Sequence, residues 1–448
     1  MVKQEKNELG LSPLPKGYID RIAKPFSSFL KIESAGGGLL LLFTIVALAL
    51  SNSPWALHFE RIWEISIGLH IGPLESSRSI REWINDALMT LFFFLVALEL
   101  KRELILGELR KPRVAALPII AALGGMAIPP LIYLALQAGQ PGQHGWGTVM
   151  ATDTAFVIGC LALLGTRIPQ SLRLFMLSLA IIDDIGAIMV VAIGYSNNIS
   201  WDSLSLALLG LLTIRAMTML GLRGFPLYFL VGTTIWLAID ASGIHPTITG
   251  VILGLMTPAR RWVNDKRLYA ILGQVVSHPT SRESSRDTQD RITLQVAAIA
   301  ARESLSPVER LEIALHPWVG FFIMPLFAFA NAGFPFAFGD FSNSVTVAVF
   351  SGFVLGKPIG ILFLSWLAVR LHIATRPPEL TWGLIAGGSL LAGIGFTMAL
   401  FITSLAFDES LASSAKLGIF IASAFSAMAG VLLLTWLHAR KKPPGASD

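Results

Sequence analysis

The sequence contains little charge and almost no cysteine. Only 14% of its 448 residues are Asp, Glu, Lys or Arg, whereas soluble domains carry about 25%. Hydrophobic residues make up 54% of the chain, and the mean hydropathy is +0.66. This scarcity of charge excludes an ordinary soluble enzyme and predicts one polytopic membrane domain. Cys160 is the single cysteine, which excludes an intrachain disulfide and a cysteine-based metal site.

Long apolar runs fill most of the chain. Because a spanning helix needs about 20 mostly apolar residues, these runs predict an all-α, polytopic membrane protein with about twelve transmembrane helices. We assign residues 26–437 to the transmembrane domain, residues 1–25 to an N-terminal tail and residues 438–448 to a C-terminal tail. The approximate span centres are Leu41, Phe94, Leu123, Ile158, Ile185, Leu211, Thr234, Val251, Met324, Gly360, Gly395 and Ala427.

Basic residues alternate between the predicted connections. Lys and Arg occur in the N-terminal tail, in residues 101–111, 167–173, 260–267 and 370–376, at Arg223 and in the C-terminal tail. None occurs in residues 137–147, 197–203, 241–245 or 334–344. By the positive-inside rule, this alternation predicts that both termini are cytoplasmic. The net charge of +5 therefore reflects orientation in a lipid bilayer, and no nucleic acid partner is expected.

Two connections are long enough to hold structure of their own. Residues 52–82 form the predicted first external loop. Alternate residues from Phe59 to Leu69 are mostly apolar and Gly72 follows, so the segment is either a β-hairpin or a plain surface loop. Residues 260–310 are the longest polar segment and predict a cytoplasmic loop. Ser306 followed by Pro307 predicts a helix start there, because Ser is a good N-cap and Pro suits the first helical position.

Four charges lie deep inside apolar stretches. A charge at the bilayer centre costs about 2.5–3.5 kcal/mol on insertion scales, so such residues are functional candidates. Asp153 stands between Thr152 and Thr154, and this turn offers several oxygen ligands to a hard cation such as Na⁺. The alternative is that the same atoms only cap a broken helix.

Asp183 and Asp184 form the strongest local signal, because their flanks are apolar on both sides. Neighbouring helix residues differ by about 100° around the axis, so the two carboxylates cannot face the same point. One carboxylate can face a cation while the other faces another helix, which is the chemistry of a proton carrier. The alternative is a structural pair that is permanently protonated.

Lys357 is the fourth buried charge, and Pro358 after it removes a backbone donor and distorts the helix. A buried Lys needs an acidic partner, for which Asp183 or Asp184 is the candidate. The alternative is that Lys357 extends to the membrane interface.

Several spans also contain helix-weakening residues at membrane depth. Transporters use interrupted helices at matched positions of inverted repeats. We expect residues 152–153 and residues 393–397 to form such a pair. For any single Gly, close helix contact is the alternative explanation.

These residues together give the chain a resemblance to the NhaA-type bacterial sodium/proton antiporters. The matching segments follow one another in order over nearly the whole span region. They are WINDALM at 83–89, LELKREL at 98–104, ATDTAF at 151–156, IIDDIGA at 181–187, PLFAFANAG at 325–333, LGKP at 355–358 and GIGFTM at 393–398.

The resemblance implies a twelve-helix fold with inverted repeats and two interrupted helices that cross. Asp153 would compensate the helix ends at the crossing, Asp184 would bind the transported Na⁺ most directly, and Asp183 would pair with Lys357 and exchange protons. Thr152 would support the cation site, so the predicted Na⁺ ligands are Asp184, Asp183 and Thr152.

The resemblance also implies exchange of cytoplasmic Na⁺ or Li⁺ for external H⁺ in the bacterial inner membrane, in a homodimer and without a cofactor. The exchange would be regulated by pH and electrogenic, and would serve pH homeostasis and salt tolerance. A cytoplasmic cluster associated with the pH response would comprise Glu99, Arg102, Glu103, Glu312 and His316. Ile313 stands where the family's best-known pattern has His, which puts the pH set-point in question.

Two other classes fit parts of the pattern. A cation channel or sodium-coupled symporter would also use buried carboxylates, although Lys357 opposes cation flow through a pore. An intramembrane aspartyl protease would need two facing Asp residues such as Asp153 and Asp184, but the sequence has no Gly-x-Gly-Asp motif.

Overall fold

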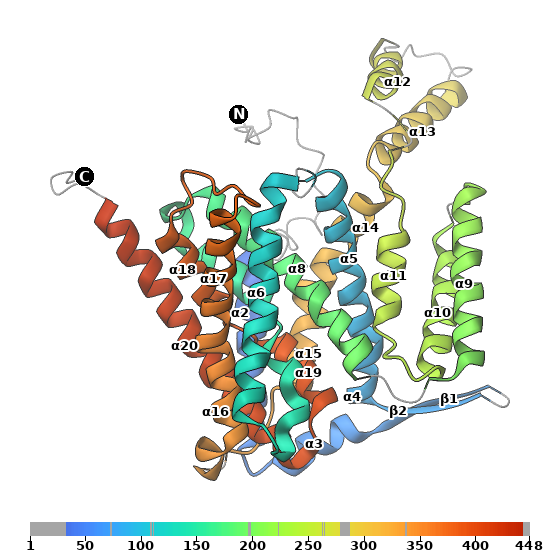
Figure 1. The fold of residues 1–448 in the computed structure, drawn as a ribbon. Helices are drawn as coiled ribbons and strands as arrows, with labels where there is room; N and C mark the ends of the chain where they lie inside the picture. The colour runs from blue at the N-terminus through green and yellow to red at the C-terminus, as the bar shows by residue number, and fades with distance from the viewer. Residues whose placement is uncertain are drawn as a thin grey trace, which may run out of the picture.

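The structure is a computed structural model that describes residues 33–441 except 72–73, 108–109, 111, 196–198, 223, 262, 264, 278–286 and 337. Among the described residues, seven helical segments are long and apolar enough to span a membrane. They are Ile80–Ile105, Ala115–Leu136, Gln170–Gly194, Trp201–Met219, Pro307–Asn331, Ser344–Arg370 and Ser410–Arg440. Figure 1 shows them as a bundle of helices that run mostly along one direction.

These segments consist of the following elements in chain order. They are α4 (Ile80–Trp83), η1 (Ile84–Leu88) and α5 (Met89–Ile105); α6 (Pro112–Leu136); α8 (Gln170–Gly194); α9 (Trp201–Met219); α14 (Pro307–Trp318), η5 (Val319–Ile323) and α15 (Met324–Asn331); α16 (Ser344–Ser351), η7 (Gly352–Gly356) and α17 (Lys357–Arg370); and α20 (Glu409–Lys441). The turns η1, η5 and η7 are π-helical.

Three further apolar helix pairs are bent at a short break. They are α2 (Glu33–Ser51) with α3 (Ala56–Glu64), bent by 115°; η3 (Pro141–Val149) with α7 (Thr154–Leu164), bent by 44°; and α18 (Trp382–Leu391) with α19 (Phe396–Ala406), bent by 49°. The remaining helices are η4 (Gly165–Arg167), α10 (Phe225–Ala241), α11 (Ile248–Met256), α12 (Asp265–Ser277), α13 (Asp287–Glu303) and η6 (Phe338–Ser342).

Every predicted span centre lies within a helix, except Gly395, which is the residue before α19. The prediction of an all-α, polytopic protein is therefore confirmed. Figure 1 shows α9 and α10 side by side at one edge of the bundle, with α11 between them and α5.

The segment 52–82 contains both a helix and a hairpin. Strand β1 (Ser66–Ile71) pairs antiparallel with β2 (Leu74–Ser79), and the hairpin lies at the end of the bundle opposite α12 and α13 (Figure 1). The apolar alternation that starts at Phe59 is not one strand, because its first part belongs to α3. Phe59 and Trp63 are four residues apart and so share one helix face, where both rings contact Phe329.

The segment 260–310 also differs from the expected loop. Its described residues include α12 and α13, which contact each other and project from the bundle (Figure 1). The polar composition is typical of a loop, but apolar residues such as Leu268, Ile271 and Leu272 recur at helical spacing. The predicted helix start is confirmed, since Ser306 caps α14 and shares a capping box with Glu309.

Helices α6 and α17 approach closely because glycines meet at their contact. A Cβ atom on Gly360 would overlap the backbone oxygen of Gly124, and a Cβ on Gly356 would lie 2.6 Å from Cα of Pro129. Gly356 and Gly360 flank Lys357 on the same helix. This contact, together with the π-helical turn before Lys357, fixes where that side chain enters the bundle.

Candidate ion-binding site

The two interrupted helices meet at their breaks. The backbone N–H of Asp153 donates to the carbonyl oxygen of Ile394 at 2.6 Å. Oδ2 of Asp153 accepts hydrogen bonds from the backbone N–H, at 2.9 Å, and from the hydroxyl of Thr397, while Oδ1 accepts from the N–H of Phe156 at 3.2 Å. The buried carboxylate of Asp153 thus lies at the N-terminal ends of α7 and α19, where the helix dipoles favour a negative charge.

Lys357 and Asp183 form an ion pair that is fully buried. Nζ of Lys357 lies 2.6 Å from Oδ2 of Asp183, and both side chains are 0% exposed. The same ammonium group donates to the hydroxyl of Thr152 at 2.9 Å, and this hydroxyl donates to the carbonyl oxygen of Ala392 at 2.9 Å. Lys357 therefore joins α17 to α8 and to the break before α7.

Asp184 has a different partner from Asp183. Its Oδ2 accepts a hydrogen bond from the hydroxyl of Thr154 at 3.0 Å, and the residue is 2% exposed. Within the part of the chain that the structure describes, Oδ1 of Asp184 and Oδ1 of Asp183 have no hydrogen-bond partner. Two carboxylate oxygens on neighbouring residues are thus buried and open to a proton or to a hard cation.

The structure brings together all five predicted residues of the membrane site: Thr152, Asp153, Asp183, Asp184 and Lys357. The pairing of Asp183 with Lys357 is the one that the resemblance implied, whereas the partners of Thr152 and Thr154 could not be derived from the sequence. Thr152 contacts Lys357, whereas the hydroxyl that contacts Asp184 belongs to Thr154. All the atoms that could coordinate a cation here are oxygen atoms. No group of three or more His, Cys, Asp or Glu side chains arranged for a resident metal occurs among the described residues.

Four of the five predicted pH-response residues also lie together. Arg102 forms an ion pair with Glu312 and lies 3.5 Å from Glu103, and Glu99 interacts electrostatically with all three. Glu312 is on α14 and is 7% exposed, whereas the other three residues are on α5. His316 is exposed and makes no contact with them in the described residues, and Ile313 is 63% exposed.

A second charged cluster was not anticipated from the sequence. Arg78 of the hairpin contacts the carboxylates of Asp86 and Asp240, and its guanidinium lies 5.3 Å from the ring centre of Trp236. Burial and the positive charge of Arg78 lower the pKa of His245 to about 4, so the ring 3.6 Å from Asp86 is neutral at pH 7. These charged residues are visible in the sequence, but nothing there indicates that they contact one another, because they come from three separate segments.

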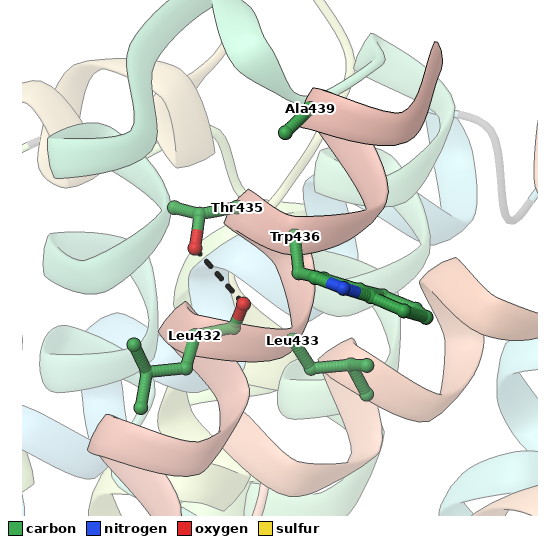
Figure 2. A pocket seen from close by; sticks show the side chains of 5 residues that line it. All are labelled: Leu432, Leu433, Thr435, Trp436 and Ala439. Atoms are coloured by element: carbon green, nitrogen blue, oxygen red, sulfur yellow. Dashed lines mark hydrogen bonds between the residues drawn. The ribbon is translucent and has the colours of Figure 1, made fainter.

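A surface pocket lies away from these charges, on the C-terminal part of α20. Figure 2 shows its lining, which is mostly apolar; its polar side-chain atoms are the hydroxyl of Thr435 and the indole nitrogen of Trp436, and the hydroxyl donates to the carbonyl oxygen of Leu432 at 2.9 Å. The lining residues are Leu432, Leu433, Thr435, Trp436 and Ala439. No charged side chain lines this pocket, so it offers no charged ligand for a cation.

The fold and the site together define the class of this protein. It is a polytopic helical membrane protein whose few buried charges meet where interrupted helices cross, and intramembrane charges of this kind mark ion pathways in transporters. Residues 27–434 match the family described as Na⁺/H⁺ antiporter 1, and the chain belongs to that family.

Individual relatives match over almost their whole lengths. The Na(+)/H(+) antiporter NhaA 2 of Acidiphilium cryptum (strain JF-5) is 58% identical over 434 residues, which cover 97% of each chain. The antiporter NhaA 2 of Vibrio vulnificus (strain CMCP6) is 56% identical over 443 residues, or 99% of each chain. The antiporter NhaA of Rhizobium meliloti (strain 1021) is 57% identical over 427 residues, which cover 95% of this chain and 98% of the relative.

Proposed function

We propose that this protein exchanges cytoplasmic Na⁺ or Li⁺ for external H⁺ across a bacterial inner membrane by alternating access. It acts as a transporter, not as an enzyme, and needs no cofactor. The observation that carries the proposal is the buried ion pair of Asp183 and Lys357 beside Asp184, whose Oδ1 has no partner among the described residues. The relatives named above are Na⁺/H⁺ antiporters, which supports the choice of ions.

Competition between the two ions for the same carboxylates couples their movements. When Asp184 is ionised, its oxygens bind Na⁺. Asp183, the neighbouring residue, offers the same cation its open carboxylate oxygen. A cation near Asp183 weakens its attraction to Lys357, and the ammonium group then releases a proton. When the site faces the outside, protons displace Na⁺ and the protonated site returns. Rocking of the two repeats changes the exposed side.

Several finer features belong to the same proposal. Two or more groups that titrate allow more protons to enter than Na⁺ ions leave, which makes the exchange electrogenic. Glu99, Arg102, Glu103 and Glu312 supply the pH response from the C-terminal part of α5 and from α14. Among the described residues, His316 makes no hydrogen bond or ion pair with them. The protein works as a homodimer with both termini in the cytoplasm.

Exchange in proteoliposomes tests the proposal. Asp184→Asn removes the negative charge but keeps the size of the side chain, and it should abolish pH changes driven by Na⁺. Asp202→Asn is the matched control, because Asp202 is exposed in the first turn of α9. Normal exchange by Asp184→Asn would refute the proposal. Na⁺ flux that needs no opposing pH gradient would instead indicate a channel, and Na⁺ moving with a second solute would indicate a symporter.

A further inference from the structure

The three residues at the break before α7 each contact a different helix. Asp153 has an extended backbone, with φ −85° and ψ 98°, so the side chains around it point in different directions. Thr152 contacts Lys357 of α17, Asp153 contacts Thr397 of α19, and Thr154 contacts Asp184 of α8. This short segment therefore contacts Lys357 and Asp184 directly, and it reaches Asp183 through Lys357.

Thr154 is the residue of this segment that acts on Asp184. It is the first residue of α7, and its hydroxyl has a single hydrogen, which is donated to Oδ2 of Asp184 at 3.0 Å. This bond restricts rotation of the carboxylate and leaves Oδ1 as the open oxygen. The charged groups that act on Asp184 from the surrounding elements are Asp183, Asp153, Glu99 and Lys357.

We propose that Thr154 is a positioning residue for Asp184 and sets the cation affinity of the exchange. This inference rests on the proposed exchange function. The inference goes beyond that function. The sequence pointed to Thr152 as the residue whose hydroxyl supports the cation site, and the geometry assigns that task to Thr154 instead.

Removal of the hydroxyl frees the carboxylate of Asp184 to rotate, so its open oxygen spends less time where a cation binds. Hydrogen bonds to charged groups are strong enough that loss of one changes affinity by roughly tenfold or more. Maximal turnover at saturating Na⁺ and high pH should change little, because all charges remain.

The test compares Thr154→Val, which keeps the shape, with Thr154→Ser, which keeps the hydroxyl. In proteoliposomes, Thr154→Val should raise the KM for Na⁺ about tenfold at fixed pH, with little change in the maximal rate. Thr154→Ser should restore the KM. Thr249→Val is the matched control, because the hydroxyl of Thr249 on α11 is buried and has no partner among the described residues.

The outcomes separate the inference from the function on which it rests. An unchanged KM for Na⁺ in Thr154→Val would overturn the inference, and so would a Thr154→Ser variant as impaired as Thr154→Val. A lower maximal rate with unchanged KM would show a purely structural role and would also overturn it. In each case, loss of exchange in Asp184→Asn leaves the proposed exchange function standing. Normal exchange in that variant would refute the proposed function itself.

Discussion

The buried ion pair of Lys357 and Asp183 predicts an unusual pattern of stability. Both side chains are 0% exposed and 2.6 Å apart, and removing one partner from such a pair costs about 3–5 kcal/mol because the other charge stays buried alone. Replacing both partners with apolar residues of similar volume is often neutral. Lys357→Met and Asp183→Leu should therefore each be strongly destabilising. The free energy of unfolding of the double variant should lie within about 1–2 kcal/mol of the wild-type value.

Denaturant unfolding in detergent, followed by tryptophan fluorescence, measures these free energies of unfolding. The matched comparison is Arg261 with Glu309, an ion pair of 3.1 Å in which Arg261 is 45% exposed. The same cycle at that exposed pair should give a coupling of at most about 1 kcal/mol. If the double variant of Lys357 and Asp183 loses the sum of the single losses, about 6–10 kcal/mol, the two charges do not depend on each other and the reasoning fails.

Two further predictions concern helix contact and regulation. Gly360→Ala would place a methyl group against the backbone oxygen of Gly124, so it should lower the free energy of unfolding by about 1–3 kcal/mol. Gly38→Ala, where a Cβ meets nothing within 4 Å, should not; equal losses would refute the argument. Arg102→Ala removes the cation from Glu312, so half-maximal exchange in proteoliposomes should move to more alkaline pH without a lower maximal rate. An unchanged or acidic midpoint would count against this role.

The breaks in the two interrupted helices could be predicted because their residues are unfavourable in a continuous apolar helix. A carboxylate at 153 and glycines at 393 and 395 are costly at membrane depth unless the backbone there is buried in protein. The sequence therefore indicated both breaks, and the structure joins them through the hydrogen bonds of Asp153 to Ile394 and Thr397.

The individual contacts within the site could not be predicted in the same way. Thr152 and Thr154 both flank Asp153, and nothing in their order shows which of them reaches Asp184. The answer depends on the extended backbone at Asp153, which is set by the α19 residues that bind it. Asp183 and Asp184 were equally suitable partners for Lys357 on the residues alone, and the orientation of α8 against α17 decides between them.

The connections outside the bundle were less predictable for a related reason. Alternation of apolar residues in a short segment fits a strand or part of a helix. The segment 52–82 holds one after the other, with Trp63 in α3 and Ile67 in β1. The polar composition of residues 260–310 likewise concealed the two helices, because average polarity carries no information on period.

The arrangement at the break before α7 gives these observations one physical consequence. An ordinary helix would send Thr152, Asp153 and Thr154 to directions about 100° apart and give each backbone group its own partner. The break instead leaves Asp153 to bind α19, while the hydroxyl of Thr152 meets Lys357 and that of Thr154 meets Asp184. A displacement of this short segment must therefore change all three contacts together. If Asp184 binds the cation as proposed, this segment links that binding to the ion pair of Lys357 and Asp183, in addition to the electrostatic interaction of Asp184 with Lys357.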